Sequence, residues 1–173
     1  MNGSIYEREL AAILSGSRSA VERFTKKIPP EDRGVVSTII RRPFFVTRSA
    51  GSLGADLIAV RHDFSLIIEV KSSQKRTIAF SDSSGKRQEQ AERLNLRCQQ
   101  AGLFLMYAFR LKGIKGDGWR LFSVEGDPAG RLKLLYNILP RLHTTASNNY
   151  SLRWEEGMPL VSFIRYVNME YMD

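Results

Sequence analysis

The stretch SAGSLGADLIAVRHDFSLIIEVKSS (residues 49–73) predicts the centre of the fold. Residues 55–60 and 64–70 are two runs of β-branched and large apolar residues, and the three polar residues between them suit a tight turn. We therefore expect a β-hairpin. With the turn centred between the two runs, Asp56 faces Glu69 across the strands, at a spacing where like charges repel each other. Two carboxylates placed in this way favour a cation between them.

Lys71 follows Glu69 by two residues, so both side chains project from the same face of the strand. Carboxylate oxygens suit a hard divalent ion, and an ammonium group beside them can orient or help to deprotonate a water molecule. Asp56, Glu69 and Lys71 are therefore candidates for metal-assisted phosphodiester hydrolysis. The alternative from spacing alone is a solvated cluster of ordinary salt bridges, which contribute little when exposed.

The residues around this triad resemble the archaeal Holliday junction resolvases, a branch of the PD-(D/E)xK nuclease superfamily. The core of the resemblance is the spacing D-x12-E-V-K. Four further strings contribute to it: YEREL (6–10), RSAGS (48–52), KRQEQAERL (86–94) and GWRLFSVE (118–125). The resemblance covers most of the chain, but it excludes residues 16–42 and is less clear over residues 127–145.

This resemblance implies an α/β fold with a central mixed β-sheet flanked by α-helices, of the restriction-endonuclease-like kind. It also implies a homodimer that binds branched DNA and resolves four-way junctions by Mg²⁺-dependent hydrolysis, with Mn²⁺ as a substitute ion and no small-molecule cofactor. Two identical sites on a two-fold dimer suit paired incisions on opposing strands of a pseudo-symmetric junction.

The resemblance also assigns roles within the site. Asp56, Glu69 and the Val70 carbonyl are expected to hold Mg²⁺. Glu7 is expected to join them, directly or through a water molecule, and Lys71 is expected to position the attacking hydroxide. The catalytic residues are then Glu7, Asp56, Glu69 and Lys71, and the metal ligands are Glu7, Asp56, Glu69 and Val70.

Phosphate contacts are expected from side chains close to the triad in sequence. Glycine and serine in residues 50–54 let backbone amides approach a phosphate closely, although an ordinary turn is the alternative. Gln90 matches a glutamine that lies near the catalytic groups of the resolvases. The expected DNA-binding residues are Arg8, Arg48, Ser49, Ser52, Lys75, Arg76, Lys86 and Arg87.

The first predicted helix, residues 4–14, carries an apolar stripe with Glu7 at its border, where a carboxylate can reach into a site. The alternative is that Glu7 only caps the helix and complements its dipole. Glu9 is expected on the opposite face, away from the site. Residues 16–42 are predicted to be a helical insertion whose basic side chains either extend a DNA surface or form a solvated face.

The remaining patterns predict a single domain over residues 1–173. Residues 131–142 are ambiguous between strand and helix. Cys98 is expected in the core, on the inward face of its helix. Helices are expected at 19–27, 86–100 and from 159 onward, and strands at 44–49, 77–80, 103–111, 119–124 and 150–154.

Composition agrees with a nucleic-acid partner. The 173 residues include 26 Lys and Arg against 18 Asp and Glu, which gives a formal charge of +8 and favours a polyanion, with an anionic membrane surface as the second choice. No run of 18 apolar residues and no N-terminal apolar segment occurs, so neither a membrane nor secretion is indicated, and a cytoplasmic, DNA-associated location is expected. A single cysteine and two isolated histidines offer no zinc site.

Two other functions remain open at this point. The first is an endonuclease of the same superfamily, of restriction or repair type, acting on another DNA substrate; the unusual residues 16–42 keep it open. The second is a non-catalytic protein that binds branched DNA through its basic face. The triad argues against the second, because phosphate binding gains nothing from two added carboxylates.

Overall fold

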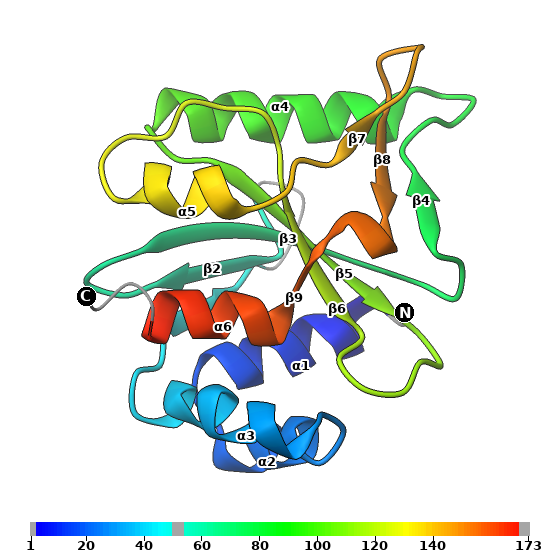
Figure 1. Ribbon diagram of the computed structural model, residues 1–173. Helices are drawn as coiled ribbons and strands as arrows, with labels where there is room; N and C mark the ends of the chain where they lie inside the picture. The colour runs from blue at the N-terminus through cyan, green and yellow to red at the C-terminus, as the bar shows by residue number, and fades with distance from the viewer. Residues whose placement is uncertain (1–2, 50–53, 170–173) are drawn as a thin grey trace.

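A six-stranded mixed sheet forms the centre of the computed structural model, which describes residues 3–49 and 54–169 (Figure 1). The strand order is β1-β2-β3-β5-β6-β9, and the β3–β5 pair is parallel whereas the other pairs are antiparallel. The predicted mixed sheet is therefore confirmed. The strands are β1 (Phe45–Arg48), β2 (Leu57–Val60), β3 (Ser65–Ser73), β5 (Leu105–Leu111), β6 (Trp119–Ser123) and β9 (Met158–Pro159).

Helices flank the central sheet, as predicted. The helices α1, α2, α3 and α6 lie on one side of it and α4 lies on the other (Figure 1). Because parallel strands need a crossover connection, α4 lies in the segment that links β3 to β5. The helices are α1 (Gly3–Leu14), α2 (Arg18–Thr25), α3 (Pro30–Ser37), α4 (Lys86–Gln100), α5 (Leu132–Ile138) and α6 (Leu160–Asn168), with short 3-10 turns at Thr38–Ile40 and Trp154–Glu156.

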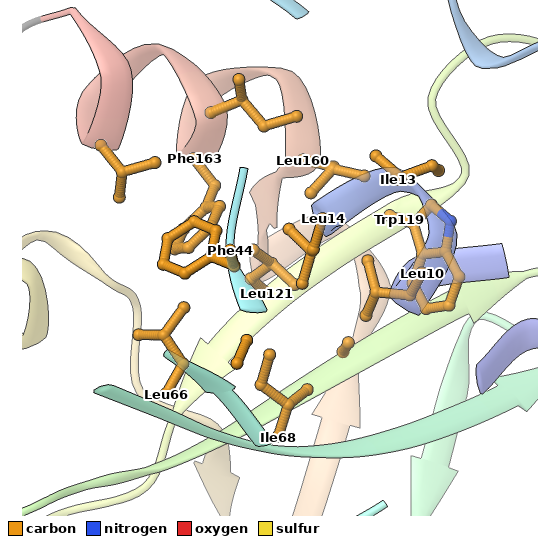
Figure 2. Close-up of a cluster of buried hydrophobic side chains, with 14 of the residues drawn as sticks. Leu10, Ile13, Leu14, Phe44, Leu66, Ile68, Trp119, Leu121, Leu160 and Phe163 are labelled. Atoms are coloured by element: carbon orange, nitrogen blue, oxygen red, sulfur yellow. The ribbon is translucent and has the colours of Figure 1, made fainter. Parts of the chain in front are cut away.

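The main core lies between the sheet and the α1/α6 side. Figure 2 shows side chains from α1, β3, β6 and α6 meeting there, and all ten labelled side chains are at most 2 % exposed. Burying this much apolar surface is the principal force that holds the sheet against the helices. The labelled residues are Leu10, Ile13, Leu14, Phe44, Leu66, Ile68, Trp119, Leu121, Leu160 and Phe163.

The β2–β3 hairpin has the predicted register, since Leu57 pairs with Ile68 and Val60 with Ser65. β3 is longer than β2. Residues 69–73 therefore pair with β5 on one edge, while on the other edge no strand pairs with them in the described part of the chain. This open edge of β3 is the feature that places the site.

The polar residues of the hairpin turn make contacts within the fold. Arg61 and Asp63 form a two-bonded ion pair, with nitrogen–oxygen distances of 2.7 and 2.9 Å, and the Asp63 side chain is only 1 % exposed. The Arg61 guanidinium also donates to the Asn168 side chain at 2.7 Å and to the carbonyls of Val167 and Arg42 at 2.9 and 2.8 Å. The turn is thus a buried polar connection to the end of α6.

Residues 16–42 form helical structure that shares the main core. Helix α2 ends two residues before the end of the predicted helix 19–27. Helix α3 begins at Pro30, whose fixed φ suits a first helical position. Phe24 and Val36 are 5 % and 0 % exposed. Asp32 accepts a hydrogen bond from Arg165 of α6 at 3.1 Å. The segment therefore packs against α1 and α6 as part of the same body of structure.

The ambiguous residues 131–142 divide into α5 and an extended stretch that bridges to β6. The structure also contains a second, three-stranded antiparallel sheet. Its order is β4-β8-β7, so the strand directly after the hairpin pairs with a late segment of the chain. Its strands are β4 (Thr77–Ala79), β8 (Tyr150–Arg153) and β7 (His143–Thr144). None of the described helices has the length and apolar character needed to cross a membrane.

Candidate active site

The candidate active site lies at the open edge of β3. Asp56 comes directly before β2, and its Oδ2 accepts a hydrogen bond from the backbone N–H of Val70 at 2.8 Å. Its backbone carbonyl accepts from the N–H of Ser49 at 3.0 Å, which continues the β1–β2 pairing by one residue. These two bonds fix Asp56 on both sides, and they bring its carboxyl group to that of Glu69, as the register predicts.

The two carboxyl groups strongly affect each other. Burial, together with the hydrogen bond and negative charge of Asp56, raises the pKa of Glu69 to about 8, while the charge of Lys71 acts in the opposite direction. A proton or a cation is therefore needed for this pair near neutral pH. A divalent ion would replace the proton, because it removes the repulsion between the two charges.

Lys71 projects from the same face of β3 as Glu69, as predicted, and both line a cavity of about 330 Å³ between the sheet and α4. The Lys71 ammonium lies 5.9 Å from the centre of the Phe80 ring. Phe80 in turn is held by a hydrogen bond from its N–H to the Tyr150 carbonyl at 2.9 Å. The small sheet thus supports one wall of the cavity. Gln90, expected near the catalytic groups, also lines it.

Glu7 approaches the same edge from the opposite side of the sheet. α1 packs against β3 on the main-core face, whereas Glu69 and Lys71 are on the α4 face. Glu7 accepts a hydrogen bond from Arg48 at 3.3 Å, and its charge contributes to raising the pKa of Glu69. The sequence does not predict this ion pair, since it suggests a role toward the metal for Glu7 and a role toward DNA phosphate for Arg48.

The donor set suits a metal that needs few protein ligands. In residues 5–49 and 54–169, no three side chains of His, Cys, Asp or Glu gather closely enough to hold an ion. Asp56 and Glu69 form a pair, and Glu7 stands apart from them. Mg²⁺ keeps several waters and commonly takes only one or two carboxylates together with substrate phosphate oxygens. The carboxylate pair therefore fits such an ion.

The predicted DNA-binding residues divide into four groups. Arg48, Ser49 and Arg87 lie at the site, where Arg87 lines the cavity and forms an ion pair with Asp82 at 3.6 Å. Ser52 lies outside the described residues. Arg76 is engaged elsewhere: it pairs with Glu155 at 2.6 Å and stacks on Trp154 at 5.2 Å. Arg8, Lys75 and Lys86 are exposed.

Glu9, which was expected on the face of α1 away from the site, has structural partners there that the sequence does not indicate. Its Oε1 accepts a hydrogen bond from the indole N–H of Trp119 at 2.9 Å and forms an ion pair with Arg110 at 3.4 Å. Trp119 is 0 % exposed, so its indole N–H needs a buried acceptor. The sequence offers one signal for this contact, namely an acidic residue one turn from the apolar stripe of α1.

Cys98 is 4 % exposed, and burial raises the pKa of its thiol to about 11, so its predicted position in the core is confirmed. Tyr107 also lines the cavity. It pairs with Glu69 across the parallel β3–β5 ladder, and burial raises its pKa well above the ordinary range. Its sequence context, a nearly continuous apolar strand, gave no reason to place it beside the carboxylates.

A family model described as "Archaeal holliday junction resolvase (hjc)" matches residues 26–169 of this chain. The matched range contains Asp56, Glu69 and Lys71, whereas Glu7 and Arg8 precede it. A similar solved structure is that of Archaeoglobus fulgidus Hjc, a Holliday junction resolvase from an archaeal hyperthermophile. It is 17 % identical, and the match covers 82 % of this chain and 95 % of that chain with a TM-score of 0.42. No curated protein matches the sequence.

Proposed function

The chain belongs to the archaeal Holliday junction resolvase family, a family of junction-resolving endonucleases, and we propose that its reaction is Mg²⁺-dependent hydrolysis at Asp56, Glu69 and Lys71. The observation that carries this proposal is the carboxyl pair at the open edge of β3. Burial and mutual repulsion leave the pair in need of a cation, and a lysine stands on the same face.

Asp56, Glu69 and the Val70 carbonyl would hold Mg²⁺, which supplies positive charge to the scissile phosphate. The Val70 N–H orients the Asp56 carboxylate through their 2.8 Å hydrogen bond. Lys71 lies beside the pair, where its ammonium can orient the attacking water toward phosphorus and stabilise the hydroxide as the proton leaves. Its contact with the Phe80 ring limits the positions that the ammonium can adopt.

Glu7 and Arg48 complete the site from the other side of the sheet. Arg48 is 40 % exposed in its side chain and can bind a phosphate oxygen while Glu7 keeps the guanidinium in place. Glu7 can then accept a proton through water rather than bind the metal directly. Arg8 lies on the next position of α1 and points to a different part of the surface, described below.

A homodimer follows from the substrate. A four-way junction needs cuts on two opposing strands, and one chain contains one such carboxyl pair in its described part. A two-fold dimer presents two identical sites. The edge strand β1 supports this proposal, because Phe45 is 71 % exposed there, beside Ile58 of β2 at 38 %. Apolar side chains exposed on adjacent strands suit contact with a second copy.

The test is cleavage of an immobile four-way junction against a linear duplex built from the same arms, with Mg²⁺ and with EDTA. We expect paired nicks on the junction alone, and their loss in EDTA. Cutting of both substrates would instead indicate a general endonuclease. Tight binding without cutting in any divalent ion would contradict the proposed reaction.

The raised pKa of Glu69 also predicts that the stability of the metal-free protein depends on pH. This pKa is raised from 4.5 to about 8, so the folded protein retains a proton that the unfolded chain has lost. The stability that this group contributes is complete below pH 4.5 and is lost as the pH rises toward 8. In EDTA, the melting temperature of the wild type should therefore fall relative to that of Glu69→Gln across this range.

Thermal unfolding of the two proteins in parallel buffers measures this difference. Added Mg²⁺ should stabilise the wild type more at the upper end of the range than at the lower end, because the ion competes with the proton. The Glu69→Gln protein should show little of this Mg²⁺ effect. Parallel melting curves for the two proteins at all pH values would contradict the assignment.

A further inference from the structure

A second basic hollow lies between α1 and α2, apart from the carboxyl pair. It has a volume of about 420 Å³, and its floor is apolar, with Ile13 and Phe24 buried. Three cations surround it: Arg8 from α1, and Arg23 and Lys27 from α2 or its end. Helix α2 precedes residues 26–169, the range that the family model matches, whereas Lys27 lies within that range.

The cations of the hollow have no acidic partners in the part of the chain that the structure describes. Arg8, Arg23 and Lys27 are exposed, and each forms no ion pair with a described carboxylate. The one acidic residue that lines the hollow is Glu9, whose carboxylate is occupied by Trp119 and Arg110. The positive charge of the hollow is thus left for a ligand from outside.

The β5–β6 loop carries further cations, and it lies beside both the end of β3 and the hollow. Lys112 donates its backbone N–H to the carbonyl of Ser73, two residues beyond Lys71, and its ammonium lies 5.7 Å from the Tyr6 ring of α1. Farther along the same loop, Gly116 lies next to the carbonyl of Lys27, where an added Cβ would make an ordinary van der Waals contact at 3.8 Å. Figure 1 shows this loop on the same side as the N-terminal end of α1.

We call these cations the track: Lys112 beside the end of β3, the exposed Lys115 farther along the loop, and Lys27 and Arg23 at the hollow. A row of separated cations suits a line of phosphates, because each cation can neutralise one phosphate charge. Contacts of this kind position a nucleic acid without reading its sequence.

We propose that this track, Lys112, Lys115, Lys27 and Arg23 together with Arg8, binds the sugar–phosphate backbone of a duplex arm that extends away from the cleaved strand. The inference rests on the proposed function, because it takes branched DNA as the ligand. It gives residues 16–42 a role: α2 lengthens the DNA-binding surface along α1. The hollow then takes a phosphate group between Arg8, Arg23 and Lys27.

The test is the double variant Arg23→Ala/Lys27→Ala, compared with Arg93→Ala/Lys133→Ala as a matched control. The control removes the same charge from α4 and α5, where both side chains are exposed and paired only with exposed carboxylates. Junction affinity is measured over a series of salt concentrations, with a fluorescent junction and EDTA to prevent cleavage. Thermal unfolding establishes that both variants fold.

We expect the hollow variant to bind the junction about tenfold more weakly than the control, and its slope of log K against log salt to fall by about 2, one for each lost phosphate contact. An excess of enzyme should then restore its cleavage rate. Equal affinity and equal slope in the two variants would overturn the inference. Failure of the proposed function would be seen separately, as absence of cleavage by the wild type in Mg²⁺.

Discussion

Glu69→Gln is expected to lower the single-turnover rate of junction cleavage by about a thousandfold or more, and to leave junction binding in EDTA close to that of the wild type. The substitution keeps the shape of the side chain and removes the charge that would hold Mg²⁺. A metal ion contributes several kcal/mol of charge stabilisation to such a reaction, and each 1.36 kcal/mol is about tenfold in rate. Cleavage is measured on a labelled junction with enzyme in excess.

Asp56→Asn should have the same effect for the same reason. Its remaining oxygen can still accept the hydrogen bond from the Val70 N–H, so the edge of β3 should keep its structure. Glu89→Gln is the matched control, because this glutamate is exposed on α4 and pairs only with Arg93. A rate in either site variant within tenfold of that of the control would remove the carboxyl pair from the mechanism.

Arg61→Met is expected to lower the free energy of unfolding by about 3–5 kcal/mol, the usual cost of removing one partner of a buried ion pair. The side chains of Arg61 and Asp63 are 7 % and 1 % exposed, so the substitution leaves a carboxylate in the core. It also removes the donors to Asn168 and Val167 at the end of α6. Arg42 lies 3.6 Å from Asp63 and softens the loss, which favours the lower end of the range.

Urea denaturation of the purified protein measures this loss, with Arg41→Met as the control. Arg41 is exposed, so its replacement should change stability by about 0.5 kcal/mol at most. Burial acts to raise the pKa of Asp63, but the hydrogen bond and charge of Arg61 outweigh it and lower the pKa below 3.8. The contribution of the pair is therefore present above pH 3.8 and lost in more acidic solution.

The difference in unfolding free energy between the wild type and Arg61→Met should shrink accordingly as the pH falls through the lowered pKa of Asp63. An unchanged stability in Arg61→Met at neutral pH would show that the buried connection between the hairpin and α6 contributes nothing. A stability loss that persists unchanged in acid would show that lost packing, rather than the ion pair, is responsible.

Local sequence was sufficient for the parts of the fold that depend on neighbours along the chain. The hairpin and its register follow from two apolar runs and a short polar turn, and Asp56 faces Glu69 as a direct consequence. The face that Lys71 shares with Glu69 follows from the alternation of side chains along a strand. The boundaries of α4 and of the final helix lie within a residue or so of those predicted.

Contacts between distant segments could not be predicted in the same way. The Glu9–Trp119 bond joins residues 110 apart and the Arg61–Asn168 bond joins residues 107 apart, and no local pattern marks either partner for the other. The position of Glu7 across the sheet from Glu69 depends on how α1 packs against β3, which is a contact between distant segments of the chain. The arrangement of the hollow between α1 and α2 likewise depends on how residues 16–42 pack.

The long-range ion pair of Arg61 has a consequence for the order of folding. The hairpin closes a loop of only a few residues, so the carboxyl pair can come together early. Arg61 gains its partners Val167 and Asn168 only when α6 docks, and these residues lie more than a hundred positions farther along the chain. Contacts of such sequence separation slow folding. We therefore expect Asp56 and Glu69 to come together while the core is still open, and the docking of α6 to be a later step of folding.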